Sequence, residues 1–328
     1  MLLIHNPMKL VVLIPAYNEE ADIEKTILNI PRKIFGIDKI EVVVVNDGST
    51  DKTEELAFNA GADKIISHKT NMGVGAAFMT GIRNAISMNA DIVTVLEAHS
   101  QFDFKQIPDL INPILNRQFD VVIGSRFSNG PPQDMPKIKQ IGNKIFSKLI
   151  SFMIGQKFTD TQTGVRAYSK DAISNIAIVH EFTYTQEVLI DLKFKGFTIC
   201  EVPMRVSYDK KRKSRVVKNI FDYSCRVISI IIRSLIYHRP ILAFGLFGVF
   251  LCAVGITAKL LTISHIQGVS VSLSSGLIIL GVVNFMLGLL ASVVFRRQSF
   301  TEKEVRHYLK DSKDLKRHRS IPTDADNF

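Results

Sequence analysis

The sequence predicts an α/β domain with a mostly parallel sheet, followed by an interfacial amphipathic helix and a two-helix transmembrane hairpin. Three observations support this architecture. Short apolar runs rich in β-branched residues alternate with helical periods early in the chain, which is typical of a parallel sheet covered on both faces. Two long apolar stretches follow, Ile241–Ile263 and Val271–Phe295. The formal net charge is +10 at pH 7, and basic residues crowd the segments beside these stretches, 210–218 and 296–319.

The expected strands and helices alternate as far as Arg126. Strands are expected at Lys9–Ile14, Ile40–Val45, Lys64–Ser67, Asp91–Leu96 and Asp120–Ile123. Helices are expected at Asp22–Ile30, Thr50–Ala60, Gly75–Met88 and Phe104–Asn116. Ligands of such sheets bind at the carboxyl ends of the strands. The unusual residues stand at those ends: Tyr17–Glu19, Asp47–Ser49, Asn71–Gly73, Glu97–His99 and Ser125–Arg126.

After Arg126 the pattern changes, and we expect an elaboration of the same domain. Ile138–Ile154 has the periodicity of an amphipathic helix, with no strand before it. Thr159–Arg166 is polar and rich in turn residues. A helix is expected at Thr185–Phe194, and the last strand at Thr198–Val202.

The segment Val216–Tyr237 has apolar residues at helical spacing, interrupted by charges, and an apolar stretch follows at once. We expect this helix to lie in the membrane interface; the alternative is an ordinary amphipathic surface helix. The stretch Ile241–Ile263 would extend about 34 Å at about 1.5 Å per residue, enough for a hydrocarbon core of about 30 Å. Because the connection 264–270 is short, the two apolar helices should be antiparallel neighbours, and their glycines allow close approach.

The flanking charges predict an orientation. Arginines lie at the outer ends of the hairpin, whereas the connection between its helices has no Lys or Arg. The positive-inside rule then places both termini and the N-terminal domain in the cytoplasm. The expected divisions are the α/β domain (1–210), a basic juxtamembrane segment with the interfacial helix (211–239), the hairpin (240–297) and a charged tail (298–328). The hairpin could also join copies of the chain into a homo-oligomer.

The composition excludes several classes of protein. The three cysteines, Cys200, Cys225 and Cys252, are too few and too scattered for a disulfide framework or a zinc site. The interleaved aromatic and basic residues of a nucleic-acid reader are not present, so no nucleic-acid partner is expected. Basic charge next to apolar segments favours anionic membrane lipids and phosphorylated ligands instead.

The motifs at the strand ends resemble those of glycosyltransferase family 2. The resemblance rests on Pro15–Glu19, Asn46–Asp51 and Asn71–Ala77, in that order. Gly124–Arg126 and Asp160–Ala167 resemble, more narrowly, the dolichyl-phosphate or polyprenyl-phosphate sugar synthases. This resemblance implies a nucleotide-sugar-binding, Rossmann-like sheet of the GT-A type. It also implies an inverting, metal-dependent transfer of a hexose from a GDP- or UDP-sugar to a polyprenyl (dolichyl) phosphate.

The resemblance assigns donor binding to residues at the ends of the first four strands. These are Pro15, Tyr17, Glu19, Asp47, Asn71, Gly73, Ala76 and Glu97. Tyr17 can stack on a nucleobase, and Pro15 fixes the turn that presents it. Asp47 can accept hydrogen bonds from the base or ribose, or it can cap the next helix. Asp51 suits the cap better, which leaves Asp47 free for the ligand.

The fourth strand end departs from the family pattern, in which Asp-x-Asp is usually followed by Gln two residues later. Here the corresponding residues are Glu97, His99 and Gln101, and we expect these three to bind Mn²⁺ or Mg²⁺. Imidazole in place of a carboxylate favours Mn²⁺. The alternative is a degraded metal site in a membrane protein that binds a nucleotide sugar without transferring it.

The resemblance also assigns residues to the acceptor. Arg126, Arg205, Ser214 and Arg215 match positions that contact the acceptor phosphate, and Arg126 joins Glu97 and His99 in the expected catalytic set. The alternative for the basic segment 210–215 is a patch attracted to anionic lipid by about 1 kcal/mol per charge.

The sequence leaves open the roles of two further residues and the chemical class of the acceptor. Arg166 and Glu187 are expected to address the sugar or to order the acceptor loop; the alternative is a structural ion pair. The acceptor could also be the hydroxyl group of another membrane lipid or of a glycan, which would require a general base.

Overall fold

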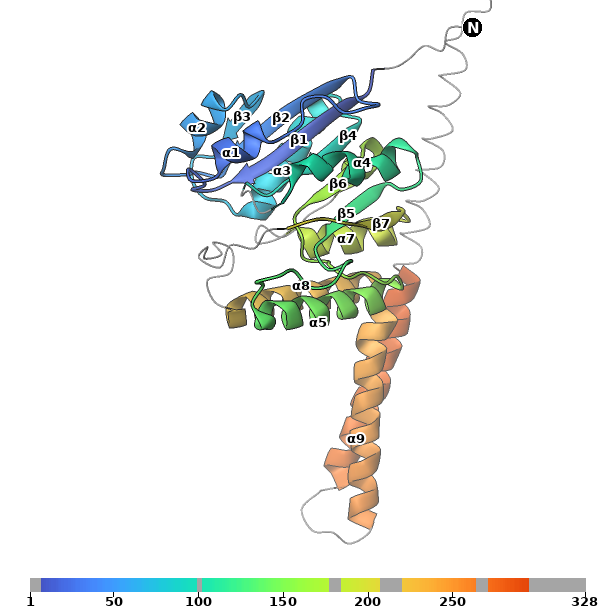
Figure 1. Ribbon diagram of the computed structural model, residues 1–328. Helices are drawn as coiled ribbons and strands as arrows, with labels where there is room; N and C mark the ends of the chain where they lie inside the picture. Colours follow the sequence, from blue (N-terminus) through green and yellow to red (C-terminus); the bar gives the residue numbers. More distant parts are fainter. Residues whose placement is uncertain (1–6, 99–101, 177–183, 207–219, 264–270, 295–328) are drawn as a thin grey trace, which may run out of the picture. The chain divides into compact units, whose positions relative to one another are not determined.

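The computed structural model describes residues 7–98, 102–176, 184–206, 220–263 and 271–294, and only the backbone of residues 220–223 (Figure 1). The chain forms two compact units, Met1–Ile231 and Ile232–Phe328. The first contains a β-sheet with its covering helices, and the second contains two long apolar helices.

Seven strands form one sheet in the first unit, in the spatial order β3-β2-β1-β4-β6-β5-β7. They are β1 (Lys9–Ala16), β2 (Lys39–Asn46), β3 (Lys64–Ser67), β4 (Ile92–Val95), β5 (Val121–Ser125), β6 (Arg166–Ser169) and β7 (Ile199–Pro203). Neighbouring strands are parallel except at β6, which is antiparallel to both β4 and β5. The sheet is therefore mostly parallel, as expected. Strand β6 was not expected, because its four residues begin with a charged side chain and contain no apolar run.

Helices cover both faces of the sheet (Figure 1). They are α1 (Ile23–Leu28), α2 (Thr53–Asn59), α3 (Val74–Ser87), the short 3-10 helix η1 (Phe104–Gln106), α4 (Ile107–Leu115), α5 (Lys137–Ile154), α6 (Lys170–Ile173) and α7 (Thr185–Phe194). Leu10, Val12 and Ile14 of β1 belong to a core shared with α1, α2 and α4. Leu13 points to the other face, where it lies against Gly81 of α3. Strand β1 is thus buried on both faces, as its continuous apolar run predicts.

The helix α8 (Ile220–His238) is amphipathic. Val227, Ile230 and Ile231 are buried, whereas Ile228 and Ile232 are largely exposed. This division confirms the amphipathic helix expected at Val216–Tyr237, although the structure describes it only from Ile220.

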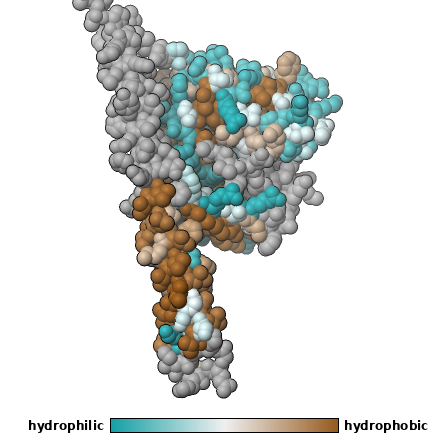
Figure 2. All heavy atoms as spheres, turned by 180° about the vertical axis from the view of Figure 1, so that it is seen from behind, coloured by the Kyte–Doolittle hydropathy of each residue, from teal (hydrophilic) through white to brown (hydrophobic). Residues whose placement is uncertain are grey.

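The second unit consists mainly of two helices that are long and apolar enough to cross a membrane. The first covers Ile241–Leu261, with a mean hydropathy of 2.4, and the second covers Val271–Val294, with 2.6. The first begins as a π-helix, η2 (Ile241–Gly245), and continues as α9 (Leu246–Ile263). Few of their residues are buried, unlike those of a helix in a soluble core, and Figure 2 shows a largely apolar surface over them.

These two helices are antiparallel and touch through glycines, as the sequence predicts. A Cβ atom on Gly248 would lie 2.6 Å from the carbonyl oxygen of Gly281, and one on Gly255 would lie 2.9 Å from that of Ser274. The backbones therefore approach each other more closely than larger residues would allow.

Candidate functional site

The register of the sheet brings several polar loops to one edge. Ala16 pairs with Asn46, and Leu13 pairs with Val95, so β1, β2 and β4 end close together. The expected donor residues follow these strand ends, which is where ligands bind in open α/β sheets.

The loops after β1 and β2 are held together by Asn18. This residue has a positive φ of 53°, and its side-chain oxygen accepts a hydrogen bond of 2.8 Å from the backbone N–H of Thr50. Its own N–H donates to the hydroxyl oxygen of Ser49 at 2.9 Å. The carboxylate of Asp51 accepts from the N–H of Thr53 at 3.0 Å at the start of α2, although Lys52, and not Asp51 as expected, stands at the N-cap position.

Asp47 lies at the centre of this group and is almost completely buried. Its Oδ1 accepts from the N–H of Met72 at 2.9 Å, and its Oδ2 accepts from the N–H of Gly73 at 2.8 Å. The ring of His68 forms a third contact, 2.7 Å from Oδ1. The expectation that this carboxylate is free for a ligand is therefore wrong, because protein groups already hold it. Its part in donor binding remains a prediction.

The other predicted donor residues surround this group. Tyr17 is 37% exposed beyond the end of β1. Pro15 belongs to β1, and the buried Glu19 donates its N–H to the hydroxyl oxygen of Thr53 at 2.7 Å. Three more lie at the start of α3: Asn71 and Gly73 just before it, and Ala76 in its first turn. The structure thus places these seven predicted donor residues at the end of β1, after β2 and around the start of α3.

Gly48 explains how closely these loops pack. Its φ is +70°, and a Cβ atom there would lie 2.4 Å from the carbonyl carbon of Thr70. Both conditions require glycine. The loop after β2 therefore sits directly on the segment that leads to Asn71 and Gly73.

Glu97 stands two residues beyond β4 and is half-buried. Its Oε1 accepts a hydrogen bond of 3.1 Å from the N–H of Gly164. The hydroxyl of Tyr184 donates to the carbonyl oxygen of Gly164 at 3.1 Å. Burial raises the pKa of Tyr184 well above its usual value, so this phenol stays protonated and keeps donating. The predicted metal ligand is therefore tied to the loop before β6.

Of the three predicted metal ligands, the structure describes only Glu97. His99 and Gln101 lie outside the described residues. Within the described ranges, no three His, Cys, Asp or Glu side chains gather in a metal-binding group. A half-buried carboxylate such as that of Glu97, which accepts the N–H of Gly164, is a type of oxygen ligand that divalent ions bind. Together with an imidazole and an amide oxygen, this donor chemistry fits a divalent ion.

Arg166 is completely buried at the start of β6. Its guanidinium donates to three backbone carbonyl oxygens, those of Thr161, Thr163 and Thr185. Such contacts support its expected role in ordering the loop. Glu187 lies in the first turn of α7 and is half-buried, and its part stays a prediction.

Arg126 follows β5 and forms a two-pronged ion pair with Asp160. Its Nε lies 2.6 Å from Oδ2, and its Nη2 lies 2.9 Å from Oδ1. Asp160 is fully buried, and the Arg126 side chain is 17% exposed. Glu201 of β7 in turn accepts hydrogen bonds from the N–H groups of Thr159 and Asp160. The partners Asp160 and Glu201 were not expected, since nothing in the sequence shows which acid faces Arg126.

The other expected acceptor residues are described only in part. Arg205 is exposed, and its backbone N–H donates to the side-chain oxygen of Gln106 at 2.7 Å, which fixes it beside η1. Ser214 and Arg215 lie outside the described residues.

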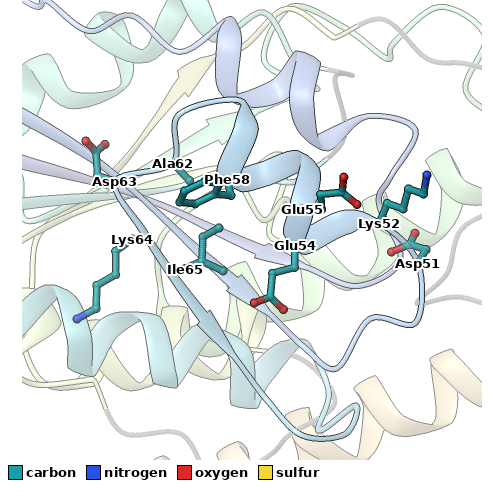
Figure 3. A pocket seen from close by; sticks show the side chains of 9 residues that line it. All are labelled: Asp51, Lys52, Glu54, Glu55, Phe58, Ala62, Asp63, Lys64 and Ile65. Atoms are coloured by element: carbon teal, nitrogen blue, oxygen red, sulfur yellow. The ribbon is translucent and has the colours of Figure 1, made fainter.

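A surface hollow beside α2 and β3 is a different feature (Figure 3). It is lined by Asp51, Lys52, Glu54, Glu55, Phe58, Ala62, Asp63, Lys64 and Ile65. Four of these are acidic and two are basic, which disfavours a diphosphate. None is an expected site residue.

Comparison with known proteins identifies the family of this chain. Residues 11–177 match the family model "Glycosyl transferase family 2". The chain is 31% identical over 225 residues to the UDP-N-acetylglucosamine–dolichyl-phosphate N-acetylglucosaminyltransferase of Methanococcus voltae, covering 62% of this chain and 88% of that protein. It is 31% identical over 195 residues to the dolichyl-phosphate hexose transferase of Haloferax volcanii, covering 60% and 81%.

A solved structure shows the same fold. Glucosyl-3-phosphoglycerate synthase from Mycobacterium tuberculosis, in complex with Mn²⁺, UDP-glucose and phosphoglyceric acid, has a TM-score of 0.53 at 20% identity. The match covers 70% of this chain and 79% of the synthase. The sheet is thus of the GT-A type, as expected. The family match spans half of the chain, so this chain belongs to glycosyltransferase family 2 and is a glycosyltransferase.

Proposed function

We propose that this enzyme transfers a hexose from a GDP- or UDP-sugar to a polyprenyl (dolichyl) phosphate, with inversion, at the cytoplasmic face of a membrane. The observation that carries the proposal is the sheet edge where Asp47 and Glu97 lie, in a chain that also has two membrane-length helices. The names of the relatives from Methanococcus voltae and Haloferax volcanii support the lipid-phosphate acceptor.

The donor site would use the exposed ring of Tyr17 for the base and the loops around Asp47 for the nucleoside. Glu97, His99 and Gln101 would hold the metal ion, Mn²⁺ or Mg²⁺, and the imidazole favours Mn²⁺. Such an ion stabilises the negative charge that develops on the departing diphosphate.

The acceptor site would use cations rather than a base. A phosphate monoester has a second pKa of about 6, so it is already a dianion at neutral pH. One of its oxygens attacks the anomeric carbon while the bond from that carbon to the diphosphate breaks, and the nucleoside diphosphate leaves. Arg126 is held in place by Asp160 and would address the acceptor phosphate together with Arg205, Ser214 and Arg215. Pre-oriented cations of this kind bring two phosphate-bearing reactants together.

The location follows from the hairpin and the charges around it. Arg233 and Arg239 precede the first span, and Arg296 and Arg297 follow the second. The positive-inside rule favours the cytoplasm for both termini and for the α/β domain. The basic residues at 210–218 would also attract anionic lipids.

The test is an assay of lipid-extractable sugar. Membranes that contain the full chain are incubated with radiolabelled GDP-mannose, UDP-glucose or UDP-N-acetylglucosamine, with polyprenyl phosphate, and with Mn²⁺ or Mg²⁺. We expect labelled lipid with one donor, and its loss both with a chelator and in Glu97→Gln. An exposed carboxylate elsewhere, Glu24→Gln on α1, is the control that keeps activity. The absence of labelled lipid in every combination would overturn the proposal.

A further inference from the structure

Tyr184 is a buried residue at the start of α7. Its ring stacks on that of Phe78 of α3, with the two ring centres 4.0 Å apart and the planes 6° from parallel. Close packing of this kind holds a side chain in one orientation. The hydroxyl oxygen of Tyr184 therefore has a fixed position between α3 and the loop before β6.

The hydroxyl of Tyr184 and the carboxylate of Glu97 both contact Gly164. The carbonyl oxygen of Gly164 accepts from the tyrosine at 3.1 Å, and its N–H donates to Oε1 of Glu97 at 3.1 Å. A Cβ atom on Gly164 would lie 3.0 Å from that Oε1 and 3.2 Å from the tyrosine oxygen. Gly164 is thus packed between the two side chains, with little room for a larger residue.

The two hydrogen bonds act on a residue whose backbone has unusual conformational freedom, because glycine has no Cβ. The bond from Tyr184 fixes the carbonyl group of Gly164 and so limits rotation of the backbone on that side. The N–H on the other side then keeps its direction towards Glu97. Without the tyrosine hydroxyl, this N–H would hold the carboxylate of Glu97 less firmly.

A second tyrosine provides a comparison within the same core. Tyr168 of β6 is also buried, and its ring lies edge-on to that of Phe78, with the centres 6.1 Å apart. The hydroxyl of Tyr168 lies near the guanidinium of Arg166, but within the described residues no group has hydrogen-bond geometry to it. Both tyrosines contact Phe78, and of the two it is Tyr184 that bonds to the residue holding Glu97.

We propose that Tyr184 positions Glu97 for a divalent metal ion and that it acts through Gly164. Because Glu97 is a metal ligand only in the proposed function, this role of Tyr184 rests on that proposal. Tyr184 would not touch the ion; it is a positioning residue. A carboxylate that already has its orientation binds a metal ion more tightly, since hydrogen bonds behind a ligand tune its affinity.

The test compares Tyr184→Phe, which keeps the stacked ring and removes the hydroxyl, with Tyr168→Phe. The full chain is purified in detergent without metal, and Mn²⁺ binding is measured from the loss of the free-ion signal in electron paramagnetic resonance. We expect the Kd for Mn²⁺ to rise about 5-fold in Tyr184→Phe, the effect of one net hydrogen bond, and to stay unchanged in Tyr168→Phe. An equal rise in both variants would overturn the proposal.

A second readout needs neither metal nor activity. Hydrogen–deuterium exchange of the metal-free chain reports on the N–H of Gly164, and we expect this group to exchange faster in Tyr184→Phe than in Tyr168→Phe. Strand β1 is the internal reference, because a general loss of stability would accelerate exchange there as well. Unchanged exchange at Gly164, or equal acceleration in β1, would overturn the proposal.

Glu97→Gln separates the role of Tyr184 from the proposed function. Loss of Mn²⁺ binding in Glu97→Gln, together with wild-type binding in Tyr184→Phe, would overturn the role of Tyr184 and leave the metal site intact. Wild-type Mn²⁺ binding in Glu97→Gln would instead overturn the metal site of the proposed function.

Discussion

The ring of His68 lies 2.7 Å from the carboxylate of Asp47, with Nδ1 against Oδ1. On its other side, Nε2 lies 3.0 Å from the hydroxyl oxygen of Thr80. Because the carboxylate accepts, Nδ1 carries the proton and Nε2 accepts from Thr80 when the ring is neutral. His68 therefore connects the loop after β2 to α3 and fixes the orientation of Asp47.

Replacing His68 should weaken donor binding. In His68→Ala, Asp47 loses one hydrogen bond to a charged group, which is worth about 1.5–3 kcal/mol. We expect the KM for the nucleotide sugar to rise about 10-fold or more, with the KM for the lipid acceptor unchanged. His68→Asn keeps a donor near the position of Nδ1 and should recover part of the loss. Equal effects on both substrates, or no recovery in the Asn variant, would argue for a purely structural role.

Substitution of Gly48 should separate the loops that form the donor site. In Gly48→Ala, the new Cβ would meet the backbone of Thr70 at 2.4 Å, in addition to the strain of a positive φ, which costs about 1–3 kcal/mol. Gly130→Ala is the matched control, because its φ is +99° but no atom lies within 4 Å. We expect a much larger fall in thermal stability and nucleotide binding for Gly48→Ala. Similar losses in the two variants would show that φ alone matters.

Lysine should be unable to replace Arg126 in its ion pair with Asp160. Lysine keeps the charge but cannot make the two parallel hydrogen bonds that guanidinium makes with the buried carboxylate. We expect Arg126→Lys to fold and to lose about 2 kcal/mol of transition-state stabilisation, or about 30-fold in kcat/KM for the acceptor. Arg83→Lys changes an exposed arginine on α3 and serves as the control. Unaltered kinetics in Arg126→Lys would remove Arg126 from the acceptor site.

The close contact between the two membrane-length helices should exclude a large side chain at Gly248 but allow one at Gly276. Gly248→Leu would force the two helices apart, because even a Cβ would lie 2.6 Å from the carbonyl oxygen of Gly281. Overpacking of this kind costs about 1–3 kcal/mol or more. Gly276→Leu lies in the second helix, with nothing within 4 Å, and should be neutral. The measurement is thermal denaturation of the two detergent-solubilised variants, monitored as the loss of monodispersity with temperature.

The apolar strands were predictable, and the contacts of the site were not. β1 and β2 each contain a continuous apolar run, Leu10–Ile14 and Val42–Val45, so their positions in the sequence can be predicted without knowing their neighbours. β6 has no such run, and only its pairing with β4 and β5 makes it a strand. Likewise, the motif around Asp47 is visible in the sequence. Its partner His68 is 21 residues away, and the fold alone brings them together.

Distance along the chain also explains why the contact between Arg126 and Asp160 could not be predicted. Arg126 and Asp160 are 34 residues apart, and several acids nearby in the sequence could have faced the guanidinium. The exposed apolar residues of α5, which are Ile138, Ile141, Ile145, Leu149 and Phe152, show the reverse case. Their periodicity was visible, but periodicity could not tell which apolar residues face the core and which face outward.

The reversed strand β6 has a further consequence. β4, whose end leads to Glu97, and β5, whose end leads to Arg126, do not pair with each other; β6 lies between them. Within the sheet, the strands β3-β2-β1-β4 and the strands β5-β7 are therefore joined by a short strand that belongs to neither group. With the proposed donor and acceptor residues, mutations that alter the choice of nucleotide would lie on one side of β6, and those that alter the choice of acceptor on the other. An enzyme built in this way would be able to exchange one substrate during evolution without rebuilding the site for the other.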